Sequence, residues 1–433
     1  MKELYDKYCG CGYRVTTDSR AVKGGEVFFA LRGENFDGNA FSVKALEAGA
    51  AWAVVNADAD LPSDERFIRV EDPQATLRDL AIWHRTHVRD GKLPVIGLTG
   101  TNGKTTTKNL IASVLSAKYS VTATQGNLNN DIGVPLSLLS ITPDTEIAVI
   151  EMGANHPDDI EKLVRVSQPD YGLITNVGRA HLLGFGSFEG VKHAKGALYR
   201  WLGGRNGSVI FLNEDDPDLR EMASREHCHF FGYGVRYQGV EILPVTPESP
   251  FLKMRIGGRS VETQLVGDYN ASNVLAALAI GDYFGVPRED AVAAVAGYCP
   301  SNQRSQLVRT GRNVLIVDAY NANPSSMAAA LRNFAAVQAP DKLALLGDMR
   351  ELGEESVVEH ARILTLLAEL RIPAMLVGDE FGKALKENGL KGATCFVSSD
   401  ALAAYLHANP VSGKTILVKG SRGIMMEKTL PEL

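Results

Sequence analysis

The sequence predicts an α/β fold divided into three domains. Short apolar segments that resemble buried strands alternate with amphipathic segments along most of the chain, which is typical of mostly parallel sheets covered by helices. A glycine-rich segment, GTNGKTT, lies between one such strand and a helix. Near the end of the chain, four strand-like segments each end in polar or glycine residues, as in a Rossmann-like domain. The length of 433 residues corresponds to roughly three domains.

Composition and charge narrow the class of protein. Hydrophobic residues make up 45% and charged residues 22% of the chain, which excludes a disordered or collagen-like chain. The net charge of −6 gives no global attraction to nucleic acid, so we expect no nucleic-acid partner. No apolar run is long enough to span a membrane, and five cysteines without C-x-x-C spacing fit a reducing compartment. We therefore expect a cytoplasmic protein.

The first domain is expected at residues 1–92. Residues 26–33 and 51–56 predict short strands, and residues 77–89 have the apolar spacing of an amphipathic helix. The polar segment TTDSR precedes these elements. Such residues suit a loop that binds a diphosphate or a nucleobase, and they equally suit an ordinary turn.

The second domain is expected at residues 93–300 and the third at residues 301–433. In the second domain, strands are predicted at 95–98, 147–153, 171–178 and 208–216, with a helix at 105–119. In the third domain, strands are predicted at 314–321, 342–349, 373–380 and 415–423. Ligands of such sheets bind at the carboxyl ends of the strands.

The glycine-rich segment has the context that a phosphate-binding loop requires, because it joins a strand to a helix. Its glycines let backbone N–H groups approach phosphates, and the helix directs its positive end at them. Lys104 is suited to reach the outer phosphates, and Thr105 to place its hydroxyl on Mg²⁺. Leu98 occupies the position of the first glycine in the usual motif. A turn that only caps a helix is the alternative.

Further polar residues follow other predicted strands. Glu151 ends one strand and His181 follows the next, so both could hold a metal at the sheet edge, although a lone Glu there is usually a solvated loop residue and a lone His is usually structural. Asn270 and Asn273 lie three residues apart at a helix start, where amides can contact an adenine or simply cap the helix. Lys195, on its own, is an ordinary helical lysine.

Several motifs occur in the order found in Mur ligases, the ATP-dependent amide-bond ligases of peptidoglycan precursor synthesis. They are GTNGKTT, EMGANHP, NVGRAH, AKG, GDYNASN, DAYNANPSSM, LGDM with ELG, and VKGSRG. The resemblance extends from TDSR to VKGSRG, and it is specific because independent motifs keep their order. It implies the three-domain Mur ligase architecture. The first domain would bind the UDP end of the substrate, the central P-loop domain would bind ATP, and the Rossmann-like C-terminal domain would close over it.

The resemblance also implies roles for individual residues. The implied ATP contacts are Gly100, Thr101, Asn102, Gly103, Lys104, Thr105, Thr106, Asn270, Asn273, Arg304 and Asp318. The implied ligands of Mg²⁺, of which two ions are expected, are Thr105, Glu151, His181 and Lys195, with Lys195 carbamylated. The implied catalytic residues are Lys104, His181 and Lys195. The implied substrate contacts are Thr17, Asp18, Ser19 and Arg20 for the UDP end, and Asn321 and Asn323 for a dipeptide.

Within the family, the YNANP segment followed by LGDMRELG resembles the members that join D-alanyl-D-alanine to a UDP-MurNAc-tripeptide. The implied reaction phosphorylates a carboxylate with ATP and lets the dipeptide amine attack the acyl phosphate. The chain departs from the family pattern at Asn39, Ala197 and Tyr269, where His, Glu and His are commoner. We expect a monomer.

Other interpretations remain open. They are a sister amide ligase with another acceptor, a P-loop switch, and a UDP-sugar-binding protein without catalysis. The TDSR-bearing first domain argues against ligases such as folylpolyglutamate synthase, whose resemblance begins only at the P-loop. The third residue of the tripeptide, lysine or diaminopimelate, is not determined by the sequence.

Overall fold

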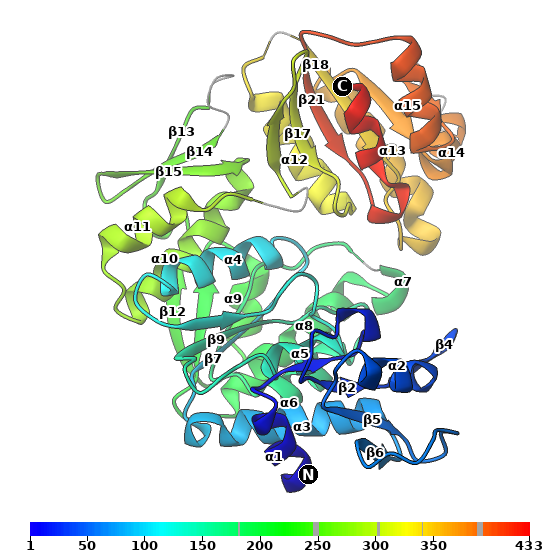
Figure 1. Cartoon of the computed structure of the whole chain (residues 1–433). Coiled ribbons are helices and arrows are strands. Elements are labelled where there is room, and N and C mark those ends of the chain that lie inside the picture. The colour runs from blue at the N-terminus through cyan, green and yellow to red at the C-terminus, as the bar shows by residue number, and fades with distance from the viewer. Residues whose placement is uncertain (181, 246–250, 301–303, 340, 388–392) are drawn as a thin grey trace.

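The computed structural model describes residues 1–180, 182–245, 251–300, 304–339, 341–387 and 393–433. Three α/β parts follow one another along the chain, and the C-terminal part lies at the end of the molecule opposite the N-terminal part (Figure 1). The predicted α/β class with parallel sheets is confirmed.

The N-terminal part has a parallel sheet with the strand order β1-β2-β5-β6. Its main strands are Val15–Thr16 (β1), Val27–Phe29 (β2), Trp52–Asn56 (β5) and Phe67–Val70 (β6), and a small hairpin joins Arg32–Gly33 (β3) to Phe36–Asp37 (β4). Its helices are Lys2–Gly10 (α1), Ser42–Glu47 (α2) and Pro73–His87 (α3). The predicted helix begins four residues earlier than expected, because the Asp72 carboxylate accepts two backbone N–H groups at its start.

The central part has a six-stranded parallel sheet with the order β12-β11-β10-β7-β9-β8. Its strands are Val95–Thr99 (β7), Val121–Ala123 (β8), Ile147–Glu151 (β9), Tyr171–Ile174 (β10), Val209–Asn213 (β11) and His229–Tyr233 (β12). Its helices are Lys104–Leu115 (α4), Gly133–Leu138 (α5), Asp159–Ser167 (α6), Leu182–Phe185 (α7), Phe188–Gly203 (α8), Pro217–Ala223 (α9), Ala271–Tyr283 (α10) and Arg288–Gly297 (α11). An antiparallel sheet of Glu241–Leu243 (β13), Phe251–Ile256 (β14) and Arg259–Val266 (β15) was not predicted.

The central sheet separates two apolar cores. Ile96 and Leu98 of β7 face the core shared with α4, α10 and α11, whereas Val95 faces the core shared with α5, α6 and α8. The second core continues into the N-terminal part through α1 and α3. Because side chains alternate along a strand, the apolar run of β7 is buried on both faces, as parallel sheets require.

The C-terminal part has a six-stranded sheet with the order β16-β17-β21-β18-β19-β20, in which only β16 is antiparallel to its neighbour. The strands are Gln306–Arg309 (β16), Val314–Asp318 (β17), Lys342–Gly347 (β18), Ala374–Val377 (β19), Thr394–Phe396 (β20) and Thr415–Lys419 (β21). The helices are Pro324–Ala336 (α12), Ser356–Glu369 (α13), Asp379–Glu387 (α14) and Ser399–Ala408 (α15). All four predicted strands of this region are confirmed, and β16 and β20 are additional.

Two buried side chains attach the N-terminal part to the carbonyl groups that follow α5. The Tyr8 hydroxyl donates to the Leu139 carbonyl at 2.8 Å, and the His84 Nε2 lies 3.0 Å from the Ile141 carbonyl. Since a carbonyl only accepts, His84 carries its proton on Nε2, and the Tyr5 hydroxyl lies 3.2 Å from its Nδ1. No helix in the described ranges is long and apolar enough to cross a membrane.

The buried His84 predicts a pH-dependent stability. Burial lowers the pKa of His84 to about 4, below the value of about 6.5 for an exposed histidine. The unfolded chain therefore binds more protons between these values, so stability that is present above pH ~6.5 is lost as the pH falls toward ~4. We expect His84 to lower the free energy of unfolding by roughly 2 kcal/mol between about pH 7 and pH 5.

Urea unfolding of the wild type and of His84→Gln at both pH values measures this contribution. The glutamine amide can still donate to the Ile141 carbonyl but does not titrate in this range. Between these two pH values, the free energy of unfolding should fall by roughly 2 kcal/mol less in the variant than in the wild type. Equal losses in both proteins would contradict the assignment of His84 as the titrating group.

Candidate functional site

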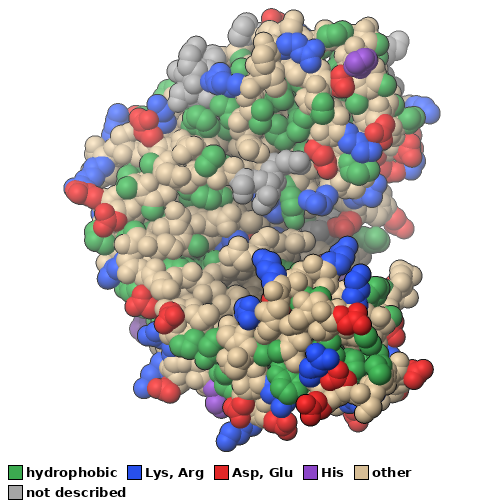
Figure 2. Space-filling model, viewed as in Figure 1, with side chains coloured by type: hydrophobic (Ala, Val, Ile, Leu, Met, Phe, Trp, Pro, Cys, Tyr) green, Lys and Arg blue, Asp and Glu red, His purple; other side chains and the backbone are tan. Residues whose placement is uncertain are grey.

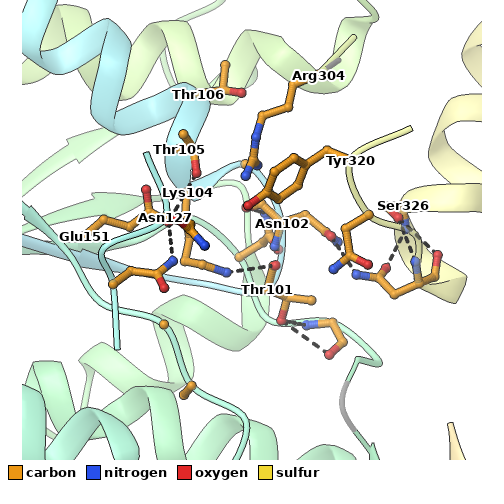
Figure 3. A pocket seen from close by; sticks show the side chains of 18 of the residues that line it. Thr101, Asn102, Lys104, Thr105, Thr106, Asn127, Glu151, Arg304, Tyr320 and Ser326 are labelled. Carbon is orange, nitrogen blue, oxygen red and sulfur yellow. Dashed lines mark hydrogen bonds between the residues drawn. The ribbon is translucent and has the colours of Figure 1, made fainter. Parts of the chain in front are cut away.

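A cavity of about 870 Å³ lies where the central and C-terminal parts meet. Residues 101–106, which follow β7, form one wall, and the ends of β17 and β21 with the residues that follow β17 form another. Figure 3 shows side chains from both parts directed toward this space. Several Lys and Arg side chains also border the recess at the middle of the molecule (Figure 2). The carboxyl ends of two parallel sheets therefore face one cavity, as the sequence predicts.

The predicted phosphate-binding loop has a fixed backbone. The Asn102 N–H donates to the Asn176 side chain at 3.0 Å, and the Asn102 carbonyl accepts from the Thr175 hydroxyl at 2.6 Å. Gly100 has a φ of +150°, and a Cβ there would lie 1.9 Å from the Thr175 hydroxyl oxygen. The Lys104 ammonium donates to the Gly100 carbonyl at 2.8 Å. These contacts hold the loop in one conformation at the start of α4, where N–H groups can bind an anion.

Glu151 ends β9, next to the strand that carries the loop, and its carboxylate is buried. Its Oε1 accepts from the Thr105 hydroxyl at 3.2 Å and from the Asn129 amide at 2.9 Å. Its Oε2 is buried without a hydrogen-bond partner among the described residues. Because an unpaired buried carboxylate oxygen is costly, this atom is suited to a cation, and the neighbouring hydroxyl of Thr105 is a second oxygen ligand.

Three lysines near the loop have a lowered pKa. Burial is the main cause for Lys104, Lys108 and Lys195, and the positive charge of Lys104 lowers the pKa of Lys195 further. The charge of Glu151 partly offsets the effect at Lys104 and Lys108. A ligand that carries phosphate charges would lower the free-energy cost of holding these three lysines in their positively charged form.

Lys195 is buried in α8 and does not line the cavity. Its ammonium lies 5.6 Å from the centre of the Phe185 ring, and the negative charge of Asp159 partly offsets the lowering of its pKa. His181, the other predicted ligand, lies outside the described residues. Across the described ranges, no three His, Cys, Asp or Glu side chains cluster as a metal site would require. A metal bound by Thr105 and Glu151 would need further ligands.

Asn270 and Asn273 both line the cavity, but part of their hydrogen-bonding capacity is already used. The Asn273 amide donates to Asn270 and accepts from the Thr107 hydroxyl, and the Asn270 amide donates to the Val266 carbonyl. Each amide nitrogen has a second N–H available for a ligand. Their contact with adenine stays a prediction.

The C-terminal wall of the cavity contains all four residues that were expected there, namely Arg304, Asp318, Asn321 and Asn323. Asp318 forms an ion pair with the buried Lys419, and the Arg304 guanidinium lies 3.7 Å from the centre of the Tyr320 ring (Figure 3). The predicted pair Asn321 and Asn323 also lines the cavity.

Asn323 has a structural role as well. Its side chain caps α12 and donates to the Asn102 side chain at 2.8 Å, which connects the C-terminal part directly to the phosphate loop.

The predicted UDP contacts Thr17, Asp18, Ser19 and Arg20 do not line this cavity. Asp18 forms an exposed ion pair with Arg20 and accepts its backbone N–H, and these hydrogen bonds lower the pKa of Asp18 to about 2. Their role stays a prediction.

Several cavity residues were missed by the sequence reasoning. Lys419 lies in the motif VKGSRG and Tyr320 in the motif DAYNANPSSM, but the sequence alone assigned a role to neither residue. Asn129 follows the three-residue strand β8, which is too short for a periodicity signal. The asparagine-rich segment GNLNND was the one signal that could have indicated this loop.

Fold and site together define an α/β protein of three parts, with a phosphate-binding type of loop in the cleft between its central and C-terminal parts. Family models match three consecutive regions: the Mur ligase family catalytic domain at residues 13–85, the Mur ligase middle domain at 98–281, and the Mur ligase glutamate ligase domain at 303–422. The chain belongs to the Mur ligase family.

Similar proteins agree with this assignment. The chain is 33% identical to the UDP-N-acetylmuramoyl-tripeptide–D-alanyl-D-alanine ligase of Bacillus subtilis, over 97% of this chain and 92% of the relative. It is 34% identical to the enzyme of that name from Escherichia coli, over 97% and 93%. Crystal structure I of MurF from Acinetobacter baumannii matches with a TM-score of 0.83 at 31% identity, over 97% and 93%. MurF from Thermotoga maritima in complex with ADP matches with a TM-score of 0.81 at 26% identity, over 97% and 96%.

The loop geometry predicts the effect of a single methyl group. In Gly100→Ala, the Thr175 hydroxyl must move and its hydrogen bond to the Asn102 carbonyl must break. We expect the affinity for ADP, measured by calorimetry, to fall by at least about tenfold, which corresponds to about 1.4 kcal/mol. The control is Gly297→Ala, since a Cβ at Gly297 has no heavy atom within 4 Å. Unchanged ADP affinity in Gly100→Ala would contradict this account of the loop.

Proposed function

We propose that the protein is an ATP-dependent ligase that joins D-alanyl-D-alanine to UDP-N-acetylmuramoyl-tripeptide. The observation that carries the proposal is the shared cavity, in which the phosphate loop and Glu151 face Asp318 and Arg304 of the C-terminal part. The names of relatives that align over nearly the whole chain supply the two substrates.

The reaction must convert a carboxylate into an amide in water. A carboxylate is a poor electrophile, so ATP phosphorylates it, and the amine of the dipeptide displaces phosphate from the acyl phosphate. The loop N–H groups and Lys104 would hold the transferring phosphoryl group and neutralise its charge. The Asn102–Asn323 hydrogen bond connects the C-terminal part to the loop, and this contact would help to restrict water at the reacting atoms.

Magnesium fits the oxygen atoms at the loop. Thr105 and Glu151 would hold the ion, which when bound would neutralise phosphate oxygens and help orient them for transfer. The Oε2 of Glu151, which is buried without a hydrogen-bond partner in the described part of the chain, supports this part of the proposal. His181 is proposed as a further magnesium ligand beside Glu151, and a carbamylated Lys195 would help to hold a second ion.

Lys195 is suited to carbamylation. Its lowered pKa leaves more of the amine neutral, and only the neutral amine attacks CO₂. A nitrogen–carbon bond forms, the nitrogen loses a proton, and the product is a buried carbamate anion. Such an anion could ligate a metal, which an ammonium group cannot do.

Three further expectations belong to the proposal. Thr17, Asp18, Ser19 and Arg20 would contact the UDP end of the substrate. The protein would act in the cytoplasm. It would act as a monomer.

Lys195→Ala should lose at least about 100-fold in kcat, since the carbamate would be absent. Short carboxylic acids such as acetate should restore part of the activity by supplying an anion in the vacated space. Lys192→Ala is the matched control, because Lys192 lies on the same helix but is paired with Asp218 and Glu221. Activity in Lys195→Ala without added acid, or no rescue by any short acid, would contradict carbamylation.

Phosphate release from Mg·ATP tests the whole function. UDP-MurNAc-tripeptide and D-Ala-D-Ala are added separately and together, with single amino acids as alternative acceptors. We expect rapid release only when both substrates are present. Release with a single amino acid in place of the dipeptide would indicate a sister ligase, and release with neither substrate would indicate a switch.

A further inference from the structure

Tyr269 connects the central part to the start of the C-terminal part. It lies in the 3₁₀ turn Asp268–Asn270 that precedes α10, and its hydroxyl is 2.8 Å from the hydroxyl of Ser305. Ser305 directly precedes β16, the first strand of the C-terminal sheet. Both residues line the cavity. This hydrogen bond therefore crosses the junction between the two parts beside the nucleotide site.

Ser305 has an unusual backbone conformation that needs such support. Its φ is +48°, which is uncommon for a residue other than glycine and persists only where surrounding contacts hold it. Its N–H donates to the Asp318 carboxylate at 3.3 Å. The preceding residue is Arg304, whose guanidinium lies against the Tyr320 ring. The position of Ser305 thus affects two charged groups that face the cavity.

On its other side, Tyr269 is attached to the phosphate loop. The neighbouring Asn270 accepts from Asn273, and Asn273 accepts from the Thr107 hydroxyl of α4. A Cβ on Gly103 would lie 2.8 Å from the Asn273 side-chain oxygen, so this amide lies directly behind the loop. Hydrogen bonds and van der Waals contacts therefore connect the phosphate loop to the turn Asp268–Asn270, and this turn to the C-terminal part.

We propose that Tyr269 is a positioning residue for nucleotide binding, because its hydroxyl holds Ser305 and thereby sets Arg304 and Asp318 against the cavity before the nucleotide arrives. The inference rests on the proposed nucleotide site. Without the hydroxyl, the junction between the central and C-terminal parts is less ordered in the free protein. Nucleotide binding must then order this junction, and the free-energy cost of doing so weakens the affinity for the nucleotide. The rate of the chemical step at saturating ATP depends little on it, because the bound nucleotide then supplies the ordering.

Tyr269→Phe removes the hydroxyl and keeps the ring. Calorimetric titration with Mg·ADP should show an affinity about five- to tenfold weaker than that of the wild type, which is the range for one lost hydrogen bond. Ser305→Ala should show the same loss. The double variant should be no weaker than either single variant, since all three lack one shared interaction. The KM for ATP should rise by a similar factor, with kcat within about twofold of the wild type.

Tyr119→Phe is the matched control. Its hydroxyl donates a 2.7 Å hydrogen bond to the Phe284 carbonyl in the central part and lies outside the cavity lining. It should bind ADP like the wild type. Wild-type affinity in Tyr269→Phe, or losses that add in the double variant, would overturn the inference while leaving the proposed function intact. A wild type that binds no ADP would overturn the proposed function, and this inference with it.

Discussion

A buried carboxylate beside a fixed anion-binding loop is the constraint on which the rest of the site depends. Glu151 ends β9, whose backbone pairs with β7, so its side chain must lie next to the loop that β7 carries. One of its oxygens is satisfied by Thr105 and Asn129, and the other has no hydrogen-bond partner among the described residues. An unpaired buried oxygen costs free energy, and the site retains it where a phosphate-bound cation would satisfy it.

The positive charges around the loop also favour a ligand that carries phosphate groups. Lys108 and Lys195 are buried near the loop and Lys104 is half-buried within it, and desolvation lowers the pKa of all three. A ligand that carries several phosphate charges removes much of the free-energy cost of this desolvation. The C-terminal part completes the enclosure, since Asn323 reaches Asn102 from the start of α12. Folding therefore assembles an electrostatic site that is incomplete until a polyanion binds between two domains.

Features encoded locally were predictable, and features that arise from distant contacts were not. The loop at Gly100–Thr106 and the strand before Glu151 follow from short apolar runs and glycine spacing, and the structure has them in place. By contrast, Lys419 pairs with a carboxylate 101 residues earlier, and no local pattern indicates such a pairing. The antiparallel sheet of β13–β15 was missed although residues 252–256 of β14 alternate between apolar and charged side chains, so a local signal for this strand was present and was overlooked. The roles of Thr17–Arg20 and of His181 rest on resemblance alone.

The domain organisation was also predictable only where local sequence encodes it. Three regions with different patterns were visible in the sequence, but the apolar core that joins α1 and α3 to α5 and α6 was not. That core forms because amphipathic helices from separate regions share one buried face, which only the folded arrangement can show.

The most direct test of the central claim is the affinity for ADP with Mg²⁺ and with EDTA, in the wild type and in Glu151→Gln. The glutamine keeps the size of the side chain and removes the negative charge. If Glu151 holds a cation on the phosphates, Mg²⁺ should tighten wild-type binding by about tenfold or more and should have little effect on the variant. Glu146→Gln, a charge change at an exposed carboxylate of the same part, should behave like the wild type. A Glu151→Gln protein that retains the full Mg²⁺-dependent gain would contradict the account.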